Sequence, residues 1–344
     1  MHDLMLLDCT IRDGGYINRW QFTDECVSEL VKTLDDIGYD YVELGFRNNP
    51  QIYNNKPCGK WRYCTEKDLV KVVPEKRKIK ISVMADYKTS NIELFSRVED
   101  TVIDMVRVAF HIPELEGALN FCKQLKQLGY IVCANAMATM NYTDDNLQKL
   151  CSLAHSANVD FLYLADSYGC LMPNDVEYIL TKMKKNLPSE SKIKLGAHLH
   201  NNIQNAVSNF YRLNEKDLVT IFDSTILGMG RGAGNLSTEL VVNIENSFTD
   251  EALKDICLFA EKYISPLYGN AQNWGSDIAF IISARFRCHP NYILKLKDFD
   301  IVDIQSVWKY INAIYEAGKH SMFDHEYLNN LVAENTVNVS VDKK

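Results

Sequence analysis

The sequence predicts an α/β protein in which eight parallel strands close into a (β/α)8 (TIM) barrel, followed by a small C-terminal helical region. Eight short β-rich runs alternate with segments of helical period, as right-handed βα units require. The 344-residue chain is long enough for one barrel of about 250 residues and an attachment. The stretch 10–15 lacks the G-x-G-x-x-G pattern usual in the alternative fold, an open dinucleotide-binding sheet. The runs are Leu4–Leu7, Tyr41–Leu44, Ile79–Met84, Met105–Ala109, Ile131–Ala134, Phe161–Leu164, Leu195–His200 and Val219–Phe222.

The helical segments carry apolar residues at three- and four-residue steps and begin at polar caps. Cys26–Ile37 is the clearest, with Thr23 or Asp24 as N-cap and Gly38 as its stop. We expect a barrel domain over 1–264, a helical region over 265–334 and a flexible polar tail over 335–344. The other expected helices are Glu114–Leu128, Thr143–Ser156, Glu251–Tyr263, Asp277–Phe286, Ile301–Ala317 and His325–Val332.

Composition and charge argue against several classes of protein. Lys+Arg 37 against Asp+Glu 45 gives a formal net charge of −8, which argues against a broad surface for nucleic acid or anionic membrane. No apolar run approaches the roughly 18 residues that span a bilayer, and Met1–Leu4 lacks the start of a signal peptide. The ten cysteines, with no C-x-x-C pair, are typical of free buried thiols. We expect a cytoplasmic protein that binds neither nucleic acid nor membrane.

The pair His198-Leu199-His200 ends the seventh β-rich run. Side chains two residues apart on a strand face the same side, and active sites of barrels lie at the carboxyl ends of the strands. Neutral imidazoles placed there are good ligands for a divalent metal. By itself the pattern is equally compatible with two solvated or hydrogen-bonded histidines.

The pair Arg12-Asp13 follows the first run and reaches the same barrel mouth. A carboxylate beside two imidazoles completes a ligand set with open positions for substrate, and the arginine offers a fixed positive charge to a developing oxyanion. The alternative is that Arg12 and Asp13 only pair with each other in a turn. Asp8 has its own alternative, a strand-end carboxylate that accepts hydrogen bonds from backbone amides.

The stretch Gly228–Asn235, after the eighth run, has four glycines in seven residues. Glycines permit positive φ angles and close approach of the backbone to a ligand, and the loop after strand eight of a barrel often binds an anion. A tight turn into the next helix would give the same composition, so this motif depends on the other two.

Together these motifs resemble the family of metal-dependent lyases and synthases that includes 3-hydroxy-3-methylglutaryl-CoA lyase, isopropylmalate synthase and 4-hydroxy-2-oxovalerate aldolase. The resemblance spans about residues 3–245. Chain length, the helical tail and Arg12-Asp13-Gly14 favour the 4-hydroxy-2-oxovalerate aldolase branch. The matching motifs, in order, are Asp8–Gly14, Glu43, Asp166–Gly169, His198–Asn201 and Gly228–Asn235.

The resemblance implies a site for one divalent metal ion. Asp13, His198 and His200 would bind the ion, and Asn235 would add a fourth ligand, as in the lyase branch. Carboxylate and imidazole ligands suit Mn²⁺, which we expect first, with Zn²⁺, Co²⁺ or Mg²⁺ as alternatives.

The resemblance also implies catalytic roles for Arg12, which would stabilise an enolate oxygen, and for Glu43, which would hold Arg12 or a water on the metal. Tyr16 departs from the pattern, because the aldolase branch has a histidine there as its acid/base. An ordinary tyrosine has a pKa of about 10, so either nearby positive charge activates the residue, or another group moves the proton, or the chemistry differs. The turn Cys288–Tyr292 could fold over the barrel mouth or be a plain helix connection. The residues expected to contact substrate are Asp8, Arg107, Ser167, Gly230 and Tyr292.

The function implied by the resemblance is a class II aldolase, a lyase that cleaves or forms the C–C bond between a pyruvate enolate and an aldehyde. Two alternatives stay open: an acyl-CoA-dependent Claisen-type synthase or HMG-CoA-lyase-like enzyme, and a catalytically silent barrel that serves as a scaffold. The expected small-molecule partners are a 2-oxo acid and an aldehyde. A homodimer, and an aldehyde dehydrogenase docked on the C-terminal helices, are further expectations.

Overall fold

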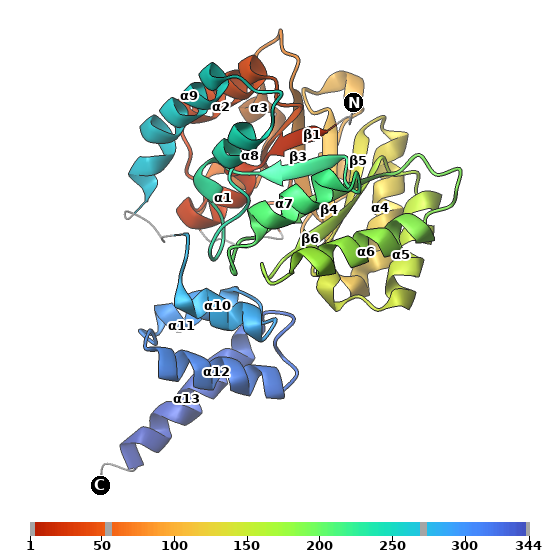
Figure 1. The fold of residues 1–344 in the computed structure, drawn as a ribbon. Helices are drawn as coiled ribbons and strands as arrows, with labels where there is room; N and C mark the ends of the chain where they lie inside the picture. Colours follow the sequence, from red (N-terminus) through yellow and green to blue (C-terminus); the bar gives the residue numbers. More distant parts are fainter. Residues whose placement is uncertain (1–3, 52–56, 269–273, 342–344) are drawn as a thin grey trace.

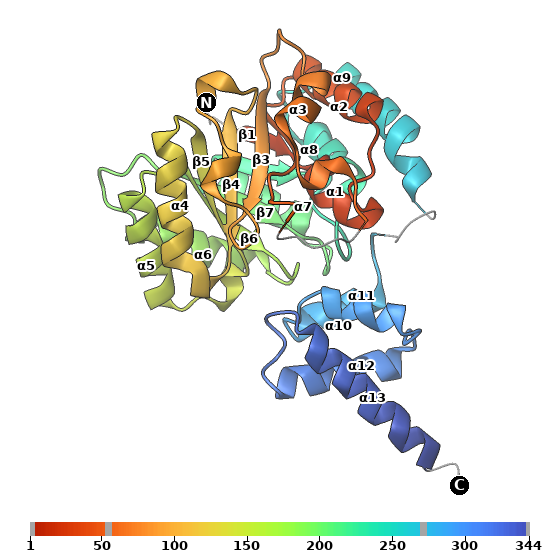
Figure 2. The same ribbon diagram turned by 180° about the vertical axis from the view of Figure 1, so that it is seen from behind.

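The computed structural model describes residues 4–51, 57–268 and 274–341, with side chains up to residue 334. Eight parallel strands pair in chain order, and β1 pairs with β8, so the sheet closes into a barrel (Figures 1 and 2). The predicted (β/α)8 fold is confirmed, and each predicted run overlaps one strand. The strands are β1 (Met5–Asp8), β2 (Tyr41–Phe46), β3 (Lys80–Asp86), β4 (Met105–Phe110), β5 (Ile131–Ala136), β6 (Phe161–Asp166), β7 (Lys194–Leu199) and β8 (Ile221–Ser224).

Helices surround the barrel, and α10–α13 form a separate bundle (Figure 1). In α2 the Thr23 side chain accepts a hydrogen bond from the Cys26 backbone N–H at 3.1 Å, and the helix ends at Gly38 with a φ of 90°, as its sequence predicts. The α-helices are α1 (Thr10–Asn18), α2 (Asp24–Ile37), α3 (Glu66–Val72), α4 (Leu115–Gln127), α5 (Asp144–Ser156), α6 (Pro173–Asn186), α7 (Ala206–Glu215), α8 (Thr238–Ile244), α9 (Asp250–Phe259), α10 (Ile278–Arg285), α11 (Asn291–Asp298), α12 (Ile304–Glu316) and α13 (His325–Val341).

The helix α1 directly follows β1 and was not predicted from the sequence. Gly14 and Gly15 weaken its helical pattern, because glycine is a poor helix former. Packing explains both glycines: a Cβ on Gly15 would lie 2.1 Å from the Trp20 ring, and a Cβ on Gly14 would lie 2.8 Å from the Met229 sulfur, so that side chain would have to move. The segment that bears Arg12 and Asp13 is therefore a helix pressed against the barrel rather than a turn.

Among the described residues, the apolar interior divides into three cores, of which the smallest consists of strand residues such as Leu7, Tyr163 and Ile221 and of Cys9. The largest core lies between the barrel and its helices and includes Trp274, whose indole N–H donates to the Leu227 carbonyl at 2.8 Å. The second core begins at Ala279 and joins the bundle helices. These two cores therefore change over between Trp274 and Ala279, after the boundary expected at residue 265. Residues 335–341 of the expected tail continue α13, and 342–344 lie outside the described residues.

The bundle meets the carboxyl end of the barrel. Tyr168, which follows β6, donates a hydrogen bond to the Ser321 carbonyl at 2.5 Å, and its ring centre lies 6.4 Å from that of His289. The segment expected as a turn, Cys288–Tyr292, leads into α11, with Pro290 at its N-cap. The sequence analysis missed α11 because proline and asparagine are common both in turns and at helix starts.

All ten cysteines are free, and most are buried, which confirms the expectation of unpaired thiols. Within the described ranges, we find no helix that combines the length and the apolar character needed to cross a membrane.

Candidate metal centre and active site

The candidate site lies at the carboxyl ends of the strands, where α1, β7 and the loop after β8 meet. Arg12 and Asp13 come from the first turn of α1, and His198 and His200 stand two residues apart at the end of β7. His200 also forms an isolated bridge with Asn235, which brings the glycine-rich loop beside the strand. Each of these five residues is 5% exposed or less. Residues up to 222 positions apart in the chain, Asp13 and Asn235, thus contact one another.

Asp13, His198 and His200, here called the ligand cluster, each bring one ligand atom to within 4.8 Å of the others. The His200 Nε2 lies 3.7 Å from the Asp13 Oδ2, and the two imidazole centres are 4.9 Å apart. The His200 Nε2 and the Asn235 Oδ1 are buried without a hydrogen-bond partner among the described residues. Buried polar atoms normally have partners, so the donor set fits a divalent cation held by carboxylate, imidazole and amide oxygen.

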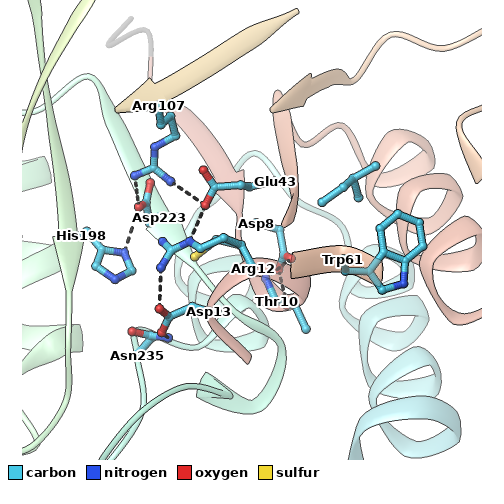
Figure 3. A network of polar contacts seen from close by, with 12 residues as sticks. Asp8, Thr10, Arg12, Asp13, Glu43, Trp61, Arg107, His198, Asp223 and Asn235 are labelled. Atoms are coloured by element: carbon cyan, nitrogen blue, oxygen red, sulfur yellow. Dashed lines mark hydrogen bonds and ion pairs between the residues drawn. The ribbon is translucent and has the colours of Figure 1, made fainter. Parts of the chain in front are cut away.

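Asp223, on β8, orients His198. The His198 Nδ1 and the Asp223 Oδ2 lie 2.9 Å apart, and a proton on Nδ1 leaves Nε2 as the nitrogen free to bind a cation (Figure 3). Cys9, His198 and Asp223 form a second group of ligand atoms, but burial raises the pKa of the Cys9 thiol, which favours the neutral thiol over the metal-binding thiolate. The sequence analysis missed Asp223. The available signal was a carboxylate near the end of a short buried strand.

Arg12, Asp13, Glu43, Arg107 and Asp223 form a buried charge network (Figure 3). The Glu43 Oε2 accepts hydrogen bonds from the Arg12 Nε at 2.6 Å and from the Arg107 Nη1 at 3.1 Å. Arg12 also pairs with Asp13, and Arg107 pairs with Asp223. Glu43 thus contacts Arg12, the first of the two roles expected for it, and each arginine in the network is paired with two carboxylates.

Charge and burial set the protonation of the ligand cluster. Burial on its own would raise the pKa of Asp13, but the charges of Arg12, His198 and His200 outweigh it and hold that pKa well below its usual range. Burial, and next the neighbouring His198, lower the pKa of His200 to about 3. Near neutral pH, Asp13 is therefore a carboxylate and His200 a neutral imidazole, the forms in which both residues bind metal.

Of the residues expected to contact substrate, Gly230 and Ser167 lie near the carboxyl ends of the strands. A Cβ on Gly230 would lie 2.5 Å from the Asp13 Oδ2 and 2.2 Å from the Asn235 Nδ2, so only glycine leaves this contact intact. The Ser167 hydroxyl, after β6, accepts a hydrogen bond from the Ala138 backbone N–H at 2.9 Å.

The other three such residues are directed elsewhere. Asp8 is fully buried and accepts hydrogen bonds from the Thr10 backbone N–H at 2.9 Å and from the Thr238 hydroxyl at 2.8 Å, so it matches the alternative of a strand-end carboxylate bound by a backbone amide. Burial raises the pKa of Asp8 to about 6. Arg107 is fully buried in the charge network. Tyr292 lies inside the bundle, where its hydroxyl donates to the Lys319 carbonyl at 2.7 Å.

Tyr16 is partly buried on α1, three residues after Asp13, and therefore on the same side of the helix. The guanidinium carbons of Arg231 and Arg62 lie 4.3 Å and 5.9 Å from the centre of its ring, and Trp20 packs edge-on at 4.8 Å. The sequence analysis named neither arginine. Arg231 stands inside the glycine-rich stretch, but a glycine pattern does not indicate where the side chain between the glycines points.

The fold and site define a class: a (β/α)8-barrel protein with a candidate divalent-metal centre at the carboxyl ends of its strands. The HMGL-like family model matches residues 3–254, and the chain belongs to this family. The resemblance inferred from the five motifs is thereby confirmed.

Three proteins within this comparison are similar to the chain over most of its length. The 4-hydroxy-2-oxovalerate aldolase of Bacillus cereus (strain ATCC 10987 / NRS 248) is 26% identical over 269 residues, which cover 76% of each chain. The oxaloacetate decarboxylase of Mycobacterium tuberculosis (strain ATCC 25618 / H37Rv) is 26% identical over 238 residues, covering 69% of this chain and 68% of that protein. A crystal structure of an N-terminal domain from Bacteroides vulgatus, described as a candidate aldolase, superposes with a TM-score of 0.75 at 26% identity, covering 89% of this chain and 99% of that one.

Proposed function

We propose that the protein is a divalent-metal-dependent aldolase, a carbon–carbon lyase that joins or separates a pyruvate enolate and an aldehyde. The observation that carries the proposal is the ligand cluster beside Arg12, because it combines a metal-ligand set with a donor for a developing anion at one barrel mouth. The similarity to 4-hydroxy-2-oxovalerate aldolase supports the same reaction class.

In the cleavage direction the substrate is a 4-hydroxy-2-oxo acid. A cation on the ligand cluster would act as a Lewis acid that polarises the 2-oxo group. Removal of the C4 hydroxyl proton lets that oxygen form the aldehyde carbonyl, the C3–C4 bond breaks, and its electron pair becomes the pyruvate enolate. Protonation at C3 then gives pyruvate, and synthesis reverses these steps.

Arg12 is the residue that we assign to the enolate oxygen. Glu43 fixes its Nε at 2.6 Å, and its Nη1 pairs with Asp13. Its Nη2 is buried and has no hydrogen-bond partner in the described part of the chain. A fixed guanidinium with one free donor suits an oxygen that gains charge during the reaction, since the donor need not reorient.

Tyr16 is the residue that we assign to the C4 hydroxyl proton. It lies on the same side of α1 as Asp13, and the Arg231 guanidinium, 4.3 Å from its ring centre, helps to hold the ring in place. The alternative carrier is His289, on the bundle side of the mouth, whose ring lies 6.4 Å from that of Tyr168.

The proposal is tested with full-length protein that is stripped of metal and then reloaded with Mn²⁺. We expect condensation of pyruvate with an aldehyde, its reversal, and no turnover of acyl-CoA thioesters. Decarboxylation of oxaloacetate would produce the same enolate and serves as a second assay. Turnover of acyl-CoA alone would favour the Claisen-type alternative, and protein that binds no transition metal would favour the scaffold.

Several finer points belong to the same proposal. Mn²⁺ is our first choice among divalent ions, because carboxylate and imidazole ligands suit it, although they also suit Zn²⁺ and Co²⁺. A cytoplasmic location, a homodimer and an aldehyde dehydrogenase on the C-terminal helices stay predictions from the sequence.

A further inference from the structure

Arg231, in the loop after β8, is a partly buried cation at the barrel mouth. Its guanidinium carbon lies 4.3 Å from the centre of the Tyr16 ring, which is a cation–π distance. Its Nε is buried without a hydrogen-bond partner, and no carboxylate forms an ion pair with it, among the residues that the structure describes. The side chain is thus held by an aromatic ring, and in that part of the chain no carboxylate lies within ion-pair distance of its guanidinium.

The contrast with the other arginines of the site is direct. Arg12 contacts both Asp13 and Glu43, and Arg107 contacts both Glu43 and Asp223. Each of these two guanidiniums already pairs with two carboxylates, and the remaining Nη2 donor of Arg12 is the one assigned above to the enolate oxygen. Of Arg12, Arg107 and Arg231, only Arg231 has no carboxylate partner among the described residues, so it is available to a second anionic group.

The loop fixes the backbone at and directly after Arg231. The Asn202 Oδ1 accepts a hydrogen bond from the Ala233 backbone N–H at 3.0 Å, and the Gly234 N–H donates to the Arg231 carbonyl at 3.1 Å. Gly232 has a φ of 69°, and a Cβ there would lie 2.8 Å from the Asn202 Oδ1. The glycines therefore permit a tight, pinned loop, which presents Arg231 with little loss of backbone freedom on binding.

His289, on the bundle side of the barrel mouth, lies close enough to Arg231 for the two charges to interact. Burial is the main cause that lowers the pKa of His289, on the bundle side, and the charge of Arg231 is the next. His289 therefore does not compete with Arg231 as a cation near neutral pH.

We propose that Arg231 binds an anionic group, a carboxylate or a phosphate, on the aldehyde substrate and so selects acidic aldehydes over neutral ones. The inference rests on the proposed aldolase function. There, the 2-oxo acid end of the substrate belongs at the ligand cluster, and the aldehyde end extends past Tyr16. An additional unpaired cation beside Tyr16 gains an anionic partner when the aldehyde carries a charge of its own.

The test compares matched aldehydes in condensation with pyruvate, using full-length protein loaded with Mn²⁺. The pairs are succinic semialdehyde against butanal, and glyceraldehyde 3-phosphate against glyceraldehyde. We expect kcat/KM to favour the charged member of at least one pair by about 10- to 100-fold, the worth of a charge-assisted hydrogen bond. The pair with the larger ratio identifies carboxylate or phosphate as the natural group.

Substitutions then connect the preference to this side chain. Arg231→Gln should reduce the charged-to-neutral ratio by about 10- to 100-fold, mainly through KM for the aldehyde. Arg231→Lys should restore part of the ratio, because lysine keeps the charge without the planar fork. The matched control is Arg97→Gln, which removes an exposed arginine paired with Glu99 and should leave the ratio unchanged.

Three outcomes overturn the inference. The first is a charged-to-neutral ratio of kcat/KM near one for both pairs in the wild type, and the second is a ratio that Arg231→Gln leaves unchanged. The third is a higher KM for pyruvate in Arg231→Gln with every aldehyde, which would place Arg231 at the 2-oxo acid. A separate NMR measurement follows the exchange of the pyruvate methyl protons in D₂O with no aldehyde present. It distinguishes failure of the proposed aldolase function from failure of the proposed role of Arg231. Exchange with a ratio near one refutes only the role of Arg231. Absence of both exchange and condensation refutes the aldolase function, and this inference with it.

Discussion

The charge network differs from the rim of the barrel mouth in how its arginines are paired. The rim is formed by Tyr16, Arg231 and His289. In the network, the two arginines are buried and paired with carboxylates. At the rim, Arg231 is partly buried and packs on an aromatic ring. Under the proposed function, this difference would divide the work: the network would fix the groups that act on the 2-oxo acid, and the rim would meet the part of the substrate that differs between aldehydes.

The largest effect should come from the ligand cluster. His200→Ala should remove the bound metal and reduce activity below detection, because one of three clustered ligands is lost. The fold should persist, which circular dichroism and thermal unfolding can check. The matched control is His155→Ala on α5, a histidine at the protein surface near Glu190, which should retain both metal and activity. Retention of metal and activity by His200→Ala would exclude His200 as a ligand.

The next largest effect should come from the rim. Tyr16→Phe should lower kcat by about 10²- to 10⁴-fold, the usual worth of general acid–base catalysis, and remove one limb of the pH–rate profile. Tyr16→His should keep much of the activity, since histidine can carry the same proton. The control Tyr178→Phe, at an exposed tyrosine of α6, should behave like the wild type. If Tyr16→Phe stays within a few-fold and keeps both limbs, the proton carrier is another group, with His289 examined first.

Arg12→Lys should lower kcat by about 100-fold or more, the loss seen when one oxyanion donor is removed. KM should change much less, because the contact strengthens in the transition state. Lysine keeps the charge but cannot hold Glu43 and Asp13 with a planar fork. Arg212→Lys, at a surface pair with Glu177, makes the same exchange and should have no effect. A normal kcat with a raised KM would show that Arg12 only binds substrate.

A smaller effect should come from the residue that orients His198. Asp223→Asn keeps the shape of the side chain but removes the charge that pairs with Arg107 and holds the His198 Nδ1 proton. Mn²⁺ affinity should fall by about 10- to 100-fold, as for other residues that position a ligand. Titration calorimetry measures the change. Unaltered affinity would mean that His198 is oriented without Asp223.

Features with a regular spacing could be predicted from the sequence. The barrel follows from eight alternating βα units, and the common direction of His198 and His200 follows from the two-residue period of a strand. Their approach to Asp13 follows from the rule that barrel strands end at one mouth. The ligand cluster could be predicted from the sequence because its position depends only on local pattern and barrel topology.

Features that depend on side-chain direction could not be predicted in the same way. In the sequence, Asp223 is one residue of a short strand, and nothing in the local pattern indicates its partner. Its Oδ2 lies 2.9 Å from the His198 Nδ1 only because β7 and β8 are neighbours in the closed barrel. The loop that carries Arg231 turns at Gly232, which has a positive φ angle. Tyr292 lies on the helix α11, which was not expected, and its hydroxyl donates to the Lys319 carbonyl inside the bundle. In each case the deciding contact is tertiary, and the sequence pattern is the same with or without it.

The central claim is that the ligand cluster holds a catalytic divalent cation, and its most direct test is a crystal structure of Mn²⁺-loaded protein with anomalous diffraction data. The account predicts one anomalous peak at the carboxyl mouth of the barrel, with one nitrogen each of His198 and His200 and an oxygen of Asp13 at bonding distance, about 2.0–2.3 Å as for related metal sites. A well-ordered, metal-replete structure in which both imidazoles face away from the ion would contradict it.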